Sequence, residues 1–124
     1  MVEFPECLGC SVKHASSART LLVECIGFKE RGDDRMARLH CFYAIGELRE
    51  AEKQMPQLLT ELKARLTDLR KRIEQSIALG RVPPHELFHE LDRVGVESIE
   101  RLEREAATLC PTCIIDRKPK VEHI

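Results

Sequence analysis

Four of the six cysteines form two Cys-x-x-Cys pairs near opposite ends of the chain, Cys7 with Cys10 and Cys110 with Cys113. The two-residue spacer lets both sulfurs of a pair reach one metal ion, and four thiolates complete a tetrahedral site for Zn²⁺. Such a closed site leaves no coordination position for a substrate. The predicted zinc is therefore structural rather than catalytic.

Other roles for these and neighbouring side chains stay open. The same four thiolates suit an iron–sulfur cluster or redox-active thiols as alternatives to zinc. His14 follows Cys10 by four residues, and the helical period places its imidazole on the inner face. We expect a hydrogen-bonded core histidine or a group that orients a ligand, and its alternative role is to replace a cysteine ligand. Cys25 and Cys41 fall at core positions, where cysteine packs as a small hydrophobic residue.

A second set of residues, His85-Glu86-Leu87-Phe88-His89, matches the H-E-x-x-H pattern of zinc hydrolases. In that pattern two histidines on one helical face hold zinc, and the glutamate activates a water molecule. Here the motif follows Pro84 directly, in the first turns of a predicted helix, and no third ligand is distinguished in the sequence. We predict that this segment is a solvated helix start. The alternatives are a metallohydrolase that uses Glu86 as general base and an accessory metal site of His85 and His89.

Apolar residues recur at three- and four-residue spacing in four segments and predict four helices that position these groups. The segments cover residues 11–31, 34–55, 59–79 and 85–109, with Gly32, Pro56 and Gly80 at the breaks. The second helix carries apolar residues on two sides and is expected to be the most buried. Sustained alternation with period 2 is absent, and only 114–115 or 121–124 is considered as a short strand. The predicted fold class is all-α.

Two arrangements of these helices bring the cysteine pairs together. In an up-down-up-down four-helix bundle, the first helix begins at the end where the fourth finishes. Alternatively, the second and third helices continue through Pro56 as one kinked central rod, and the two outer helices fold back along its halves. The rod leaves a leucine seam partly open, which favours a homodimer that covers it. The seam consists of Leu59, Leu62, Leu66, Leu69 and Ile73.

Length and composition predict a single helical domain over 1–124, with residues 1–10 and 110–124 as its cysteine-bearing segments. The formal net charge of −1 implies no overall field toward nucleic acid or an anionic membrane. No apolar run approaches the roughly 20 residues of a membrane span, and the start lacks the features of a signal peptide. We expect a cytoplasmic protein whose cysteines are metal ligands or free thiols rather than disulfides.

A resemblance to a known group of proteins rests on residues in the first half of the chain: Cys7-x-x-Cys10-x-x-Lys13-His14, Ala18, Leu21-Leu22, Glu24, Gly27-Phe28, Ala44-Ile45-Gly46-Glu47-Leu48 and Glu50-Ala51-Glu52. This pattern, over roughly the first 55 residues, resembles the opening of small helical bacterial and phage proteins of unassigned function that begin C-x-x-C-x-x-K-H. In those proteins a histidine commonly stands where this chain has Glu47, so its role does not carry over. The resemblance implies a metal-bound helical module and no activity. The function expected is a non-enzymatic, zinc-bound binding or assembly module with a protein partner.

Overall fold

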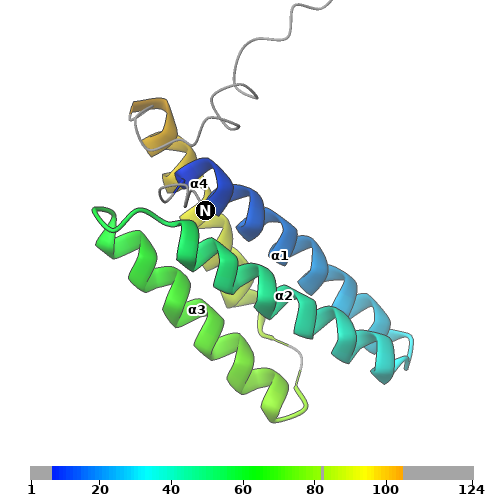
Figure 1. The fold of residues 1–124 in the computed structure, drawn as a ribbon. Helices are drawn as coiled ribbons and strands as arrows, with labels where there is room; N and C mark the ends of the chain where they lie inside the picture. The colour runs from blue at the N-terminus through cyan, green and yellow to red at the C-terminus, as the bar shows by residue number, and fades with distance from the viewer. Residues whose placement is uncertain (1–6, 82, 105–124) are drawn as a thin grey trace, which may run out of the picture.

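The computed structural model describes residues 7–81 and 83–104 of the chain. They form four helices, α1 (Leu8–Glu30), α2 (Asp34–Gln54), α3 (Thr60–Ala78) and α4 (His85–Arg104), with no strand in these ranges (Figure 1). The predicted all-α class is confirmed. The expected continuation of α4 to Leu109 and the two short strands considered lie outside the described residues.

The ends of the helices follow from local chemistry. The side chain of Asp33 caps α2 by accepting a hydrogen bond from the backbone N–H of Met36 at 3.1 Å. Gly32 and Gly80 adopt φ values of +80° and +70° after α1 and α3, a conformation that glycine reaches without a Cβ clash. Met55 is extended at φ −66° and ψ 123°, as expected for a residue that precedes proline. Because α2 ends before Pro56, the alternative of a continuous kinked rod is wrong.

The helices alternate in direction, and each packs beside its sequence neighbours (Figure 1). α1 contacts α2 and α4, and α3 contacts the same two helices, so the four surround one core. The start of α1 and the last described turns of α4 lie at the same end of the bundle (Figure 1). The predicted up-down-up-down bundle is confirmed. None of the helices in the described ranges combines the length and the apolar character needed to cross a membrane.

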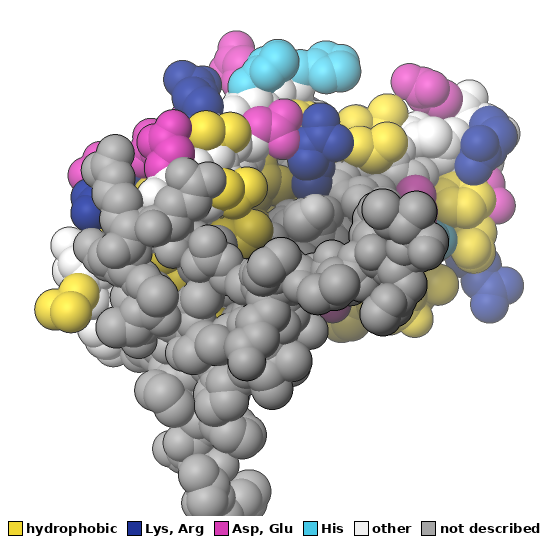
Figure 2. Space-filling model, turned by 90° about the horizontal axis from the view of Figure 1, so that it is seen from above, with side chains coloured by type: hydrophobic (Ala, Val, Ile, Leu, Met, Phe, Trp, Pro, Cys, Tyr) yellow, Lys and Arg dark blue, Asp and Glu magenta, His cyan; other side chains and the backbone are white. Residues whose placement is uncertain are grey.

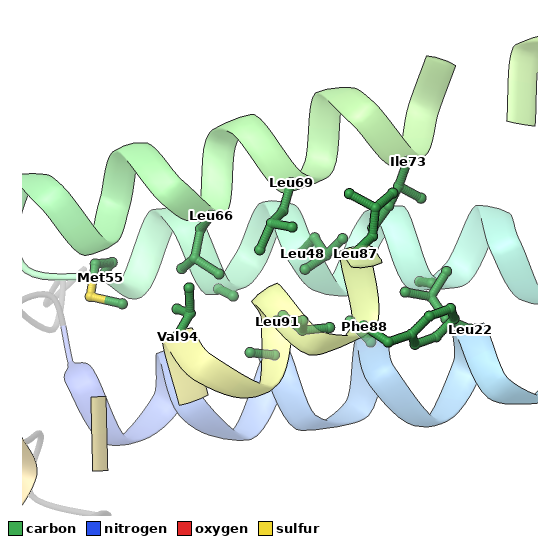
Figure 3. Packing of buried hydrophobic residues seen from close by; sticks show 14 of the residues in the cluster. Leu22, Leu48, Met55, Leu66, Leu69, Ile73, Leu87, Phe88, Leu91 and Val94 are labelled. Atoms are coloured by element: carbon green, nitrogen blue, oxygen red, sulfur yellow. The ribbon is translucent and has the colours of Figure 1, made fainter. Parts of the chain in front are cut away.

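The leucine seam of α3 closes inside this bundle. Figure 3 shows its side chains pointing toward those of α2 and α4: Leu66, Leu69 and Ile73 face Leu48, Leu87, Leu91 and Val94. Leu66, Leu69 and Ile73 are fully buried, and burial of each such side chain stabilises the fold by about 1.5–3 kcal/mol. The seam therefore needs no second chain to cover it. The homodimer stays a prediction, but the leucine seam no longer supports it.

α1 and α2 form the closest pair of helices in the described ranges, and both bury small residues. Ala15 and Ala18 of α1 and Ala44 and Ala51 of α2 belong to the shared core. With little side-chain volume between them the two backbones approach closely, and the hydroxyl of Ser11 donates a hydrogen bond to the carbonyl of Ala51 at 2.7 Å.

The outer side of α2 is exposed. Leu39, Phe42 and Tyr43 keep 40%, 71% and 52% of their surface accessible. The expectation that this helix buries two apolar sides is wrong, because neighbouring helices cover only one of its faces.

Candidate metal centre

Cys7 and Cys10 stand at the first turn of α1, at the end of the bundle where α4 returns. Cys7 is the N-cap residue, with an extended backbone at φ −129° and ψ 114°. Its Sγ accepts a hydrogen bond from the backbone N–H of Cys10 at 3.4 Å. Cys7 is buried and Cys10 is half-buried. The pair therefore sits at the edge of the core, with one sulfur already held by the backbone of the other residue.

The electrostatic setting of this turn favours negative charge. Unpaired backbone N–H groups and the positive end of the helix dipole gather at a helix N-terminus. The first turn of α1 contains no acidic residue that would compete for them. Thiolate ligands of a metal ion are anionic and accept N–H hydrogen bonds, so this turn suits two of the four predicted ligands.

The second predicted pair, Cys110 and Cys113, lies outside the described residues. Cys110 follows the last described residue of α4, Arg104, by six positions, a segment that extends at most about 20 Å. Within the described ranges, no group of three or more His, Cys, Asp or Glu side chains is arranged to hold a metal ion. The described part of the chain thus contributes two ligands of the predicted site, and the four-cysteine centre stays a prediction.

His14 is hydrogen-bonded, but it does not face the core. Its Nδ1 lies 2.6 Å from Oε2 of Glu47 on α2, and the two side chains are 35% and 34% exposed. The buried positions of this part of α1 are Ser11, Ala15 and Ala18, and His14 lies at the side of that face, where it meets α2. The prediction of an inward imidazole is wrong. A carboxylate on Nδ1 leaves Nε2 available, which is how histidine ligands are commonly oriented, so a ligand role stays a prediction.

The H-E-x-x-H residues lie on the exposed surface of α4. His85, Glu86 and His89 are all exposed, and the ring of His85 lies 6.2 Å from that of Phe88. The described part of the chain brings no third ligand to them. No contact among these residues favours a metal site. Their use in a metallohydrolase stays a prediction.

Cys25 and Cys41 are buried as predicted, but they are joined in a disulfide between α1 and α2, with their Cα atoms 5.7 Å apart. The expectation that the cysteines are metal ligands or free thiols is wrong for this pair. One signal in the sequence could have found the bond. The two residues lie at inward positions on either side of the turn at Gly32, so a tight antiparallel pair of helices brings them face to face.

Comparisons of the chain with protein-family models, curated proteins and solved structures give no match.

Seen from above, the described surface carries acidic and basic side chains interspersed with apolar ones, without an extended patch of one sign (Figure 2).

Proposed function

We propose that the protein is a zinc-bound helical bundle that acts as a small, non-enzymatic binding or assembly module. Its ligands are Cys7, Cys10, Cys110 and Cys113. The observation that carries the proposal is the topology, because α4 returns to the end of the bundle where Cys7 caps α1 (Figure 1). A metal ion held by thiolates from both ends of the chain then joins the first and last helices.

The proposed metal stabilises the fold rather than catalysing a reaction. Four thiolates leave zinc no open position for water or substrate, and the free energy of metal binding adds to that of folding. The cytoplasmic localisation is proposed from the sequence alone. The protein-binding role rests on the exposed apolar side chains of α2, Leu39, Phe42 and Tyr43, which offer a contact surface for a protein partner or a second copy of the chain.

Elemental analysis of protein purified without added metal tests this proposal. We expect about one zinc per chain in the wild type and loss of that zinc in Cys7→Ser and in Cys110→Ser. The matched control is the double variant His85→Ala with His89→Ala, which removes two other potential zinc ligands and should keep the metal.

The same measurement separates the alternatives. A wild-type protein without metal overturns the proposal. Bound iron with a brown chromophore would show that the cysteines hold an iron–sulfur cluster instead of zinc. A second zinc that disappears in the His85 and His89 variant would instead support an additional site at the H-E-x-x-H motif.

A further inference from the structure

A small cavity opens beside the Cys25–Cys41 disulfide. Its volume is about 100 Å³, and both cysteines belong to its wall. It lies where α1 and α2 meet the segment that follows α3, represented by Gly80 and Arg81. A liquid water molecule occupies about 30 Å³, so the cavity admits a few waters or one small acidic group.

The charged side chains around this cavity are predominantly basic. Lys29, Arg38 and Arg81 line it, and the one acidic residue among its lining is Asp34. Nζ of Lys29 lies 3.0 Å from Oδ1 of Asp34, which balances these two charges. Arg38 and Arg81 form no ion pair among the residues that the structure describes. The cavity therefore carries positive charge that is not neutralised and attracts a small anion.

The two sulfurs are otherwise shielded. Cys25 and Cys41 keep only 3% and 4% of their surface accessible. The cavity gives a small reagent an approach to these two residues, and Arg38 and Arg81 belong to the same wall. From this juxtaposition we propose that Cys25–Cys41 is a reversible redox site that exchanges with a small anionic thiol. The proposal does not rest on the metal centre, which involves other cysteines, of which Cys7 and Cys10 stand at the opposite end of α1.

The exchange proceeds in two balanced steps. The thiolate of the small molecule attacks one sulfur, the Cys25–Cys41 bond breaks, and a mixed disulfide forms while the other cysteine leaves as a thiolate. A second thiolate attacks the small-molecule sulfur of the mixed disulfide. That S–S bond breaks, the small molecule is released as its disulfide, and the protein cysteine leaves as a thiolate. Two thiols are oxidised, and the protein disulfide is reduced to two thiols. The guanidinium groups favour entry of the anion and stabilise the thiolate that leaves.

Three thiols of similar size test the charge requirement: 2-mercaptoethanesulfonate is anionic, 2-mercaptoethanol neutral and cysteamine cationic. Each is added to the full-length, oxidised protein at equal thiolate concentration, and differential alkylation with peptide mass spectrometry follows Cys25 and Cys41. Rates are divided by those measured with a neutral reference disulfide, which removes differences in nucleophilicity. We expect the anionic thiol to react roughly threefold or more faster than the neutral one at low ionic strength, with cysteamine the slowest.

Substitutions then locate the effect. In the double variant Arg38→Gln with Arg81→Gln, the ratio of the normalised rate with the anionic thiol to that with the neutral thiol should fall to near one. Lys53→Gln with Lys71→Gln is the matched control, because it removes the same charge from exposed positions of α2 and α3, and Lys53 lies about 22 Å along the helix from Arg38. It should keep the preference. Circular dichroism checks that both variants retain their helices.

Two results would overturn the proposal. One is the recovery of Cys25 and Cys41 as thiols, by alkylation in denaturant, after the purified protein has been oxidised with the disulfide of 2-mercaptoethanesulfonate, because the protein disulfide then does not form. The other is an equal normalised rate for the three thiols, or a preference that survives in the Arg38 and Arg81 variant. A mixed disulfide mapped to Cys25 or Cys41 supports the first step.

Discussion

Glu74 accepts hydrogen bonds from two guanidinium groups, that of Arg49 on α2 at 3.0 Å and that of Arg70 on its own helix at 3.1 Å. Arg70 also donates to Glu52 of α2 at 2.5 Å. These contacts join α2 to α3 along one edge of the bundle. Burial by itself would raise the pKa of Glu74, but the hydrogen bonds from Arg49 and Arg70 lower it below its ordinary value of 4.5.

The sign of this shift predicts a pH dependence. Since the pKa of Glu74 is lower in the folded protein, its carboxylate stabilises the fold above the unfolded pKa, and this contribution is lost as the pH falls through the lower folded value. We expect Glu74→Gln to be less stable than the wild type near neutral pH and the difference to shrink below about pH 4.5. Urea unfolding across this range measures it. Glu50→Gln, at an exposed position of α2, is the control, and a difference that stays constant with pH would contradict the assignment.

At the scale of elements, the disulfide cross-links α1 to α2 across 16 positions of sequence. Closing a loop of this size restricts the unfolded chain and stabilises the fold by about 3 kcal/mol in the chain-entropy description. We therefore expect Cys25→Ala with Cys41→Ala to lower the free energy of unfolding by about that amount, as measured by urea unfolding. A phosphine reductant should destabilise the wild type similarly and leave the double variant unchanged. An equal response of both proteins would show that the disulfide is not the cause.

At the scale of the whole molecule, one core is shared by all four helices, and Leu66 lies within it at 0% exposure. Leu66→Ala should lower the free energy of unfolding by about 2–5 kcal/mol, because it leaves a cavity between α2, α3 and α4. The matched control is Leu58→Ala, whose side chain is 93% exposed and whose effect should stay within about 0.5 kcal/mol. Urea unfolding at two protein concentrations measures both variants. Because the seam closes within one chain, the effect of Leu66→Ala should not depend on concentration, whereas a seam shared between two chains would make it do so.

The sequence by itself determined the local features of this protein. Periodic apolar residues define the four helices, and glycine and proline mark the breaks, since both depend on neighbours a few positions apart. The buried face of α3 followed from the same spacing, and the position of Cys7 and Cys10 at a helix start followed from their place before the first apolar repeat. For the metal centre, which stays a prediction, the sequence supplied the candidate ligands. The topology of the described helices places the start of α1 and the last described turns of α4 at the same end of the bundle.

Only the tertiary structure decided how the helices face one another. Extended backbone at Met55 separates α2 from α3, although the pattern on both sides of Pro56 suited a kinked rod equally well. α1 and α2 pack closely enough to bring the Cα atoms of Cys25 and Cys41 within 5.7 Å, which allows their disulfide. The rotation of α1 about its axis decides that His14 meets Glu47 rather than the core. These features depend on distances and rotations between segments far apart in the chain, which a local period of 3.6 residues does not encode.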